Sequence, residues 1–313
     1  MQLKAIFLII LSILAVSCSQ TRSPLNYADT SRLTKDLHAL TKTEKSRNYL
    51  NPDILDSVAS YIYSELAKVC DTVCFQTYLV DNKEYRNVIG SIRSECKQRI
   101  IIGAHYDVCE EQEGADDNAS GVAGILELAR LLSKEKPAHR IDLVAFTLEE
   151  PPYFRTEKMG SYVHAKSLYD QNIDVKGMIC LEMIGYFNDS VNSQQYPLGI
   201  LRWFYGSKGD FITVVQKFNN GKFGKSVKEL MTSQTLLPTK SFTGPQTLSG
   251  IDFSDHRNYW KFGYSAVMIT NTAFYRNPHY HKNTDTMESL DLIRMSKVID
   301  EVCYCILNLG QSE

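Results

Sequence analysis

The sequence carries no excess of either charge, because 34 Lys and Arg residues stand against 36 Asp and Glu residues and the formal net charge is -2. The basic residues form no stripe, so nothing favours a nucleic-acid partner. The chain also has no internal repeat, no long linker and no apolar run of the roughly 18 residues that a transmembrane helix needs. With 43% hydrophobic residues over 313 positions, it is predicted to form one large globular domain.

The eight cysteines lack the spacing of a structural zinc site. Cys70 and Cys74 form one close pair and Cys303 and Cys305 form another, but neither has a partner pair at zinc-site spacing. The first pair is close enough to bond across a turn, whereas residues two apart on a helix point in different directions. Buried free thiols are therefore the main expectation.

The N-terminal segment is typical of an exported protein. A short positive region precedes the apolar stretch from Ala5 to Leu14, which has the length of a signal-peptide core and is too short to span a membrane comfortably. Small residues then precede a single Cys18, as in a bacterial lipobox. We expect a signal peptide over 1–17, a tether over 18–29 and one catalytic domain over 30–313. The protein would be exported to the periplasmic or cell-surface side and lipid-anchored to a bacterial membrane through Cys18, with ordinary secretory cleavage near Ser17 as the alternative.

Apolar periodicity predicts an alternation of strands and helices. Strands are expected at 75–80, 87–92, 99–104, 140–148, 175–184 and 265–270. Helices are expected at 54–69, 119–134, 161–169, 211–219, 226–236, 254–260 and 292–309. This order is typical of an α/β three-layer sandwich, in which a central mixed, mostly parallel sheet is flanked by helices. Residues 188–250 are poorly periodic and are expected to include loops that shape a cleft.

Polar side chains that can ligate a metal follow the predicted buried strands. In chain order they are His105, Asp107, Asp116, Asp117, Glu149, Glu150, Glu182 and His281. Strand ends of an α/β sheet leave a crevice where ligands gather, so we expect these side chains to converge. Several carboxylates in one crevice repel one another, and a divalent cation relieves that repulsion. Mixed imidazole and carboxylate ligands favour zinc, with manganese or cobalt possible.

Five segments together resemble the co-catalytic zinc aminopeptidases of metallopeptidase family 28, a group that includes secreted bacterial leucyl aminopeptidases and glutaminyl cyclases. The segments are GAHYD (103–107), GADDNASG (114–121), the acid pair 149–150, LEMIGY (181–186) and His281. The similarity extends from about Asn51 to the C-terminus. The resemblance implies a zinc-exopeptidase-like fold, two divalent metal ions of which zinc is the expected type, and peptide substrates.

The resemblance also implies a ligand set. His105 and Glu182 would hold one zinc ion, Glu150 and His281 would hold the other, and Asp117 would bridge both. Two metals need one bidentate bridge, and a carboxylate can supply it. The peptide bond after Asp117 is cis in relatives and is expected to be cis here.

The remaining roles concern catalysis and support. Glu149 would act as the general base for a metal-bridging hydroxide, and Asp107 would orient His105 through the second ring nitrogen. Asp255 and His256 are expected to line the site, and Asp116 is expected only to support it. The implied reaction is hydrolysis of N-terminal residues from peptides.

The sequence departs from the family pattern at several positions. Residues 151–159 are inserted after the acid pair, so they and residues 188–250 are expected to line the specificity pocket. Glu182 stands where many members have Asp, and Ile251 falls near the position of a Tyr that assists catalysis in some relatives. Cys109 is expected to be a bystander thiol.

Two other functions share these features. A glutaminyl-peptide cyclotransferase uses nearly the same motif residues, so the ligands alone do not separate it from an aminopeptidase. The third possibility is a non-catalytic binding domain, and it is disfavoured because none of the expected ligands is missing.

Overall fold

The computed structural model describes residues 27–309 of the chain. The predicted signal peptide, Cys18 and most of the predicted tether lie outside these residues. Residues 27–29 of that tether are attached to the domain, because the backbone N–H groups of 27 and 28 donate to Asp300 and Asp29 caps the first helix. Within the described range, no helix is long and apolar enough to cross a membrane.

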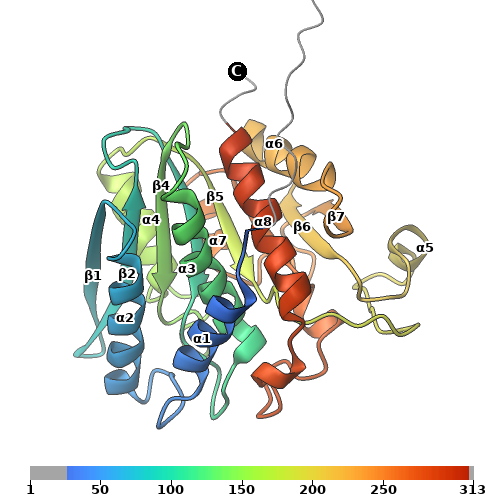
Figure 1. Cartoon of the computed structure of the whole chain (residues 1–313), viewed down its shortest axis with the longest axis horizontal. Coiled ribbons are helices and arrows are strands. Elements are labelled where there is room, and N and C mark those ends of the chain that lie inside the picture. The colour runs from blue at the N-terminus through green and yellow to red at the C-terminus, as the bar shows by residue number, and fades with distance from the viewer. Residues whose placement is uncertain (1–26, 310–313) are drawn as a thin grey trace, which may run out of the picture.

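Eight strands form one mixed sheet (Figure 1). The strands are β1 (Thr72–Val80), β2 (Lys83–Ile92), β3 (Arg99–His105), β4 (Arg140–Phe146), β5 (Val175–Glu182), β6 (Ile212–Lys217), β7 (Thr239–Gly244) and β8 (Ala266–Thr270). Their order across the sheet is β1-β2-β4-β3-β5-β8-β6-β7. The pairs β4-β3, β3-β5, β5-β8 and β6-β7 are parallel, and the other three pairs are antiparallel. The predicted mixed, mostly parallel sheet is confirmed.

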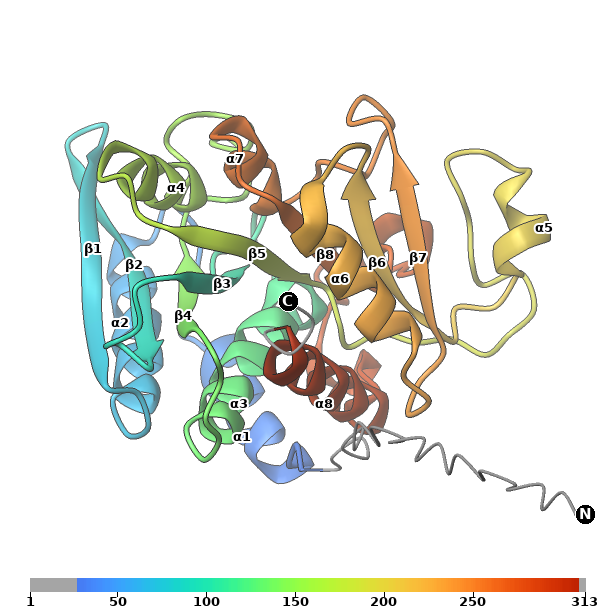
Figure 2. The ribbon, with the colours of Figure 1, turned by 90° about the horizontal axis from the view of Figure 1, so that it is seen from above.

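Helices cover both faces of this sheet (Figure 2). The helices are α1 (Thr30–Thr41), α2 (Pro52–Leu66), α3 (Gly121–Leu132), α4 (Gly160–Asp170), α5 (Leu201–Tyr205), α6 (Gly221–Thr232), α7 (His256–Lys261) and α8 (Leu292–Asn308). One face packs against α1, α2, α3, α6 and α8, and the other packs against α4 and α7. The predicted three-layer sandwich is confirmed.

The central strands are apolar throughout because both of their faces are covered. Ile100 and Ile102 of β3 belong to the core under α3, whereas Ile101 belongs to the core under α4 and α7. All three side chains have 0% exposure. This arrangement explains why the strand shows a continuous apolar run rather than alternation.

The segment 211–219 was predicted to be helical, and this prediction is wrong. It forms β6, with Ile212 and Val214 in one core and Val215 in the other. The run is short, and a short apolar run with β-branched residues fits a strand as well as a helix until its partners are known. The next helix begins at Gly221 and ends at Thr232, earlier than expected, and β7, α1 and α5 were not predicted.

The cysteines of the described residues are all free thiols. Cys70 and Cys74 do not form the disulfide that their spacing allowed. Cys303 and Cys305 are buried in α8, as expected.

Candidate metal centre

The predicted site residues meet at the edge of the sheet where the parallel strands end. His105 is the last residue of β3, and Glu182 is the last residue of β5. A short π-helical turn, η1 (Ala115–Ser120), leads into α3. The other members lie in this turn and in the loops after β4 and β8, and they are Asp117, Glu149, Glu150 and His281. Residues far apart in the sequence are thus brought together by the parallel strand order.

Asp117 lies between the two histidines. Its Oδ1 is 3.4 Å from Nε2 of His105, and its Oδ2 is 3.3 Å from Nε2 of His281. Glu182 Oε2 is 3.5 Å from the same nitrogen of His105, and Glu150 Oε2 is 3.2 Å from that of His281. The five side chains therefore form two groups that share Asp117. The peptide bond between Asp117 and Asn118 is cis, as expected.

The donor atoms of His105, Asp117 and Glu182 lie within 4.8 Å of one another, as the ligands of one ion would, whereas Glu150 and His281 form such a group with Cys109. Two atoms bound about 2.0–2.2 Å from one tetrahedral ion lie roughly 3.3 Å apart, close to the separations given above. Three atoms are buried and have no hydrogen-bond partner within residues 27–309: Oδ2 of Asp117, Oε1 of Glu150 and Nε2 of His281. Each of the two groups that share Asp117 offers one imidazole and two carboxylates, which is a donor set that zinc accepts.

Burial makes the negative charges of this cluster unfavourable. Burial raises the pKa of Glu150 to about 7, and the neighbouring Asp117 carboxylate adds to the shift. Burial also raises the pKa of Glu149 well above its usual value, although His105 opposes this shift. The pKa of Glu182 is raised by burial as well. A bound cation would stabilise the ionised carboxylates and so remove this penalty.

The two imidazoles compensate part of that negative charge. Burial alone would lower the pKa of His105, but the carboxylates of Glu182 and Glu149 outweigh it and the pKa lies well above its usual value. Burial alone would raise the pKa of Asp117, but its contacts with His105 and His281 outweigh burial and lower it. The contacts between the imidazoles and the carboxylates therefore offset part of the cost of burying these charges.

Glu149 stands slightly apart from the two groups. Its Oε2 is 4.0 Å from Nε2 of His105, whereas Asp117 and Glu182 approach that nitrogen more closely. Glu149 could also join a group with His105 and Glu150, whose donor atoms lie within 4.8 Å of one another. The shorter contacts favour Asp117 and Glu182 as the partners of His105. They leave the Glu149 carboxylate available to accept or donate a proton.

Asp107 supports both halves of the site. Its Oδ1 lies 3.6 Å from Nδ1 of His105, and its backbone carbonyl oxygen lies closer to the same nitrogen, at 3.2 Å. The carboxylate also accepts the backbone N–H groups of Glu149 and Glu150, each at 3.1 Å. Asp107 therefore fixes the backbone of the acid pair as well as one imidazole.

Asp285 is a supporting residue that the sequence did not reveal. Its two carboxylate oxygens accept the backbone N–H groups of Asp116 and Asp117, at 2.9 and 3.0 Å. Its carbonyl oxygen accepts the N–H of Ala115 at 3.1 Å. Burial, together with the nearby Asp116 carboxylate, raises the pKa of Asp285 to about 8. Asp285 thus holds the turn that carries Asp117. In the sequence, the only signal for this role is its position shortly after His281.

Asp116 has the supporting role expected of it. Its Oδ1 accepts the backbone N–H groups of Gly185 and Tyr186, and its Oδ2 accepts from the side chains of Asn271 and Asn277. The carboxylate therefore ties η1 to the segments after β5 and β8.

Glu182 is held by two polar neighbours. Ser254 Oγ donates to Glu182 Oε2 at 2.6 Å, and Asn118 Nδ2 donates to the same oxygen at 3.3 Å. Ser254 directly precedes Asp255 and His256, which were expected to line the site. Burial raises the pKa of Asp255 to about 7, whereas His256 donates to a backbone carbonyl and packs against Trp260. His256 is therefore a core residue.

The chain is similar in sequence to known proteins. The sequence profile of peptidase family M28 matches residues 87–306. The chain belongs to peptidase family M28. It is 41% identical over 290 residues to YfbL of Escherichia coli, which covers 90% of this chain and 89% of that protein. It is also 26% identical over 277 residues to a "Probable leucine aminopeptidase" of Trichophyton verrucosum, covering 84% of this chain and 68% of the relative.

Solved structures of this M28 fold are also similar. LapB of Legionella pneumophila gives a TM-score of 0.72 at 21% identity, covering 93% of this chain and 75% of LapB. A glutaminyl cyclase of Bacteroides thetaiotaomicron gives a TM-score of 0.63 at 20% identity, covering 90% of this chain and 98% of the cyclase. These likenesses show that the chain shares the fold of LapB and of the glutaminyl cyclase.

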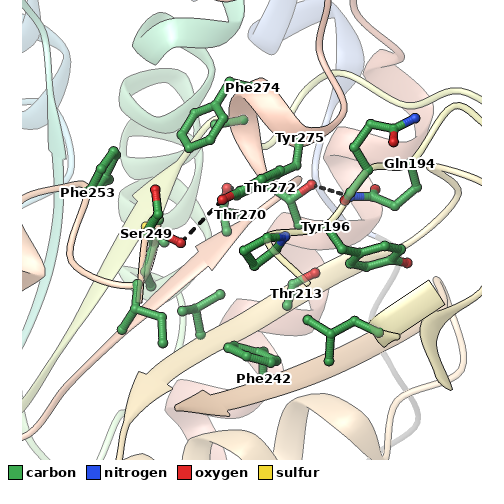
Figure 3. A pocket seen from close by; sticks show the side chains of 18 of the residues that line it. Gln194, Tyr196, Thr213, Phe242, Ser249, Phe253, Thr270, Thr272, Phe274 and Tyr275 are labelled. Carbon is green, nitrogen blue, oxygen red and sulfur yellow. Dashed lines mark hydrogen bonds between the residues drawn. The ribbon is translucent and has the colours of Figure 1, made fainter. Parts of the chain in front are cut away.

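An apolar cavity (Figure 3) adjoins the ligand cluster of this M28 family member. Two residues connect the cavity with the cluster. Glu182 belongs to the cluster and lines the cavity, and Tyr280 lines the cavity and stacks on the His281 ring with centroids 3.9 Å apart. Most of the remaining lining comes from residues 194–253, as expected for the poorly periodic region. The inserted segment 151–159 contributes nothing to this lining, and that part of the prediction is wrong for this cavity. Instead, Phe154 of the segment packs edge-on against Phe253.

Two residues that depart from the family pattern, Ile251 and Cys109, lie near the site. Ile251 is buried and lines the cavity. The sulfur of Cys109 lies within 4.8 Å of donor atoms of Glu150 and His281, so this thiol adjoins one ligand group.

Proposed function

We propose that the protein is a two-zinc aminopeptidase that removes N-terminal residues from peptides. The observation that carries the proposal is the position of Asp117, whose two oxygens face two different histidines, each paired with a further carboxylate. This arrangement suits two cations that share one bridging carboxylate.

His105 and Glu182 would hold one zinc ion, Glu150 and His281 would hold the other, and Asp117 would hold both. When bound, two zinc ions would supply Lewis acidity towards the scissile carbonyl and would lower the pKa of water from 15.7 towards about 7. The supporting contacts of Asp107, Asp285 and Ser254 would keep these ligands oriented, as outer partners of metal ligands usually do.

Glu149 would move the proton. Its carboxylate is buried, its backbone N–H is held by Asp107, and it is the acid of the pair that lies farther from the histidines. Burial raises its pKa, which suits a group that first accepts a proton from the attacking water and then delivers it to the leaving amine. General acid–base catalysis of this kind contributes about 10²–10⁴-fold in rate.

The cavity supports action on a terminal residue. It begins at Glu182, beside the place where the scissile bond would lie, and most of its lining is apolar. A concave, mostly apolar pocket suits the side chain of one bound residue.

The decisive variant is Glu149→Gln, which keeps the volume of the side chain and removes the proton acceptor. We expect it to retain zinc, measured by elemental analysis of the purified protein, and to lose about 10²–10⁴-fold in kcat on aminoacyl anilides. A variant that holds zinc and turns over at the wild-type rate would remove Glu149 from the mechanism.

The glutaminyl cyclase alternative is supported by the shared fold. Incubating the purified protein with a peptide that begins with Gln separates the two activities, because a cyclase releases ammonia and leaves pyroglutamate whereas an aminopeptidase releases free Gln. Less than one zinc per chain, unchanged by added metal, would instead indicate the non-catalytic binding domain.

We also propose that the protein is exported and anchored to the membrane through a lipid on Cys18. The support is the sequence of residues 1–18. Expression with Cys18→Ser should move the protein from the membrane fraction to the soluble exported fraction, and an unchanged membrane fraction would rule out this anchor.

A further inference from the structure

A row of side chains connects the ligand cluster with the interior of the cavity. Glu182 of β5 is in register with Thr270 of β8, and Thr270 is in register with Thr213 of β6. Residues in register on neighbouring strands point to the same face of a sheet. All three residues line the cavity, so the row forms part of its floor. Since neighbouring strands lie about 4.8 Å apart, Thr213 stands roughly 10 Å from Glu182.

The next row along the same strands is apolar. Cys180, Met268 and Val215 are in register, and Val215 is in register with Phe242 of β7. Three of these four, Met268, Val215 and Phe242, line the cavity. The floor therefore consists of an apolar row and a row with polar atoms, and the polar row leads away from the ligand cluster.

Thr213 differs from Thr270 and Gln194, two other polar side chains of the cavity. It is 4% exposed, and its hydroxyl has no hydrogen-bond partner among the described residues. Thr270 accepts the backbone N–H of Thr272, and Gln194 donates to the Thr272 hydroxyl while accepting from Arg276. Figure 3 shows Thr213 between Thr270 and Phe242, on the floor of the cavity.

An unpartnered buried hydroxyl is unfavourable unless something bonds to it. Thr213 can donate one hydrogen bond and accept others. A ligand that places a hydroxyl near Thr213 would form a hydrogen bond with it, and both hydroxyls would then have a partner.

The lining excludes charged occupants. Glu182 is the only charged residue among the described residues that line the cavity, and the proposed zinc ion would neutralise it. Lys240 continues the row beyond Thr213, but its ammonium group lies 3.6 Å from the ring centroid of Phe211 and donates to the carbonyl of Tyr205. A charged side chain in the cavity would therefore lack a counter-charge.

We propose that this cavity selects tyrosine as the N-terminal residue of the substrate, and that the Thr213 hydroxyl is the specificity-determining group. The inference rests on the proposed aminopeptidase function. Tyrosine has a rigid ring that fills an apolar space and a hydroxyl at the far end of that ring. This hydroxyl would lie some distance from the reacting bond, as the Thr213 hydroxyl does, and the two could pair. Phenylalanine fills the same space but leaves Thr213 unpartnered, and shorter hydroxyl side chains do not reach it.

The test compares tyrosyl and phenylalanyl anilides. The wild-type protein should show a kcat/KM about 3–10-fold higher for the tyrosyl compound, the effect of one neutral hydrogen bond. Thr213→Val keeps the shape of the side chain and should bring this ratio to about 1. Thr213→Ser retains a hydroxyl and should retain the preference for tyrosine.

Thr243→Val is the matched control. Thr243 lies on the neighbouring strand β7, is exposed and does not line the cavity. The same chemical change there should leave the ratio at its wild-type value.

A second readout separates this inference from the proposed function. Calorimetric binding of free L-tyrosine and L-phenylalanine to the zinc-loaded protein should show the same preference and the same loss in Thr213→Val. If no anilide is hydrolysed, the proposed function fails, and the binding ratio still decides the role of Thr213. Equal binding of the two amino acids by the wild-type protein, or a preference that Thr213→Val leaves intact, would overturn the inference.

Discussion

Replacing Asp285 by Asn should weaken zinc binding although Asp285 is not a proposed ligand. The carboxylate accepts two backbone N–H groups, from Asp116 and Asp117, and so holds the turn that carries the proposed bridging ligand. An Asn side chain has one acceptor oxygen, and its amide group would face the second N–H. One of the two N–H groups would then lie buried without a partner.

The size of the effect follows from those two contacts. Leaving one buried donor unpaired costs about 1–3 kcal/mol. If about 2 kcal/mol of this appears as misplacement of Asp117, zinc affinity falls roughly 30-fold. Asp285 also offsets the burial of Arg47, whose pKa is lowered by burial to about 10, so the folded protein loses stability as well.

Competition with a zinc-binding dye measures the affinity, and chemical denaturation with and without zinc measures the stability. The matched control is Asp189→Asn, since Asp189 is exposed and pairs with Arg294 at the surface. We expect the control to bind zinc as the wild type does. Wild-type zinc affinity in a folded Asp285→Asn protein would refute the claim that Asp285 positions Asp117.

The remaining predictions concern pH, a ligand support and the core. In the presence of a chelator, the free energy of unfolding should fall as pH rises from about 4.5 to 8. The reason is that burial raises the pKa of carboxyls such as Glu150, to about 7, so they hold protons in the folded state that the unfolded chain has released. Thermal unfolding at pH 5 and pH 8 checks this, and saturating zinc should remove or reverse the trend. Ser254→Ala removes the hydrogen bond to Glu182 and should weaken zinc binding about 10-fold, whereas unchanged affinity in the dye competition would exclude this support. Gly103→Ala places a methyl group against the Phe146 ring, and urea denaturation should show a loss of about 1–3 kcal/mol; a wild-type midpoint would mean that the ring moves aside freely.

The central part of the fold could be predicted because its strands have both faces covered. The apolar run that ends at His105 and the one that ends at Glu182 mark the middle of the sheet by composition alone. The segment 211–219 was misassigned because its short apolar run carries no periodicity that separates helix from strand. Its pairing with β8 and β7, which only the folded chain contains, makes it a strand.

The sequence by itself determined which residue types could form a metal site. Five motifs in order supply two imidazoles and their carboxylate partners, and donor chemistry depends on residue type rather than on position in space. The same motifs identify the family, whose membership the comparison confirms.

Only the tertiary structure decided how these groups are supported and what lies beside them. Asp285 and Ser254 act through contacts with residues 168 and 72 positions away in the chain, and no local pattern marks such contacts. The cavity likewise depends on strand register, which places Thr213 in line with Glu182. Ligand type is a property of single residues, whereas support and specificity are properties of distances that arise only when the chain has folded.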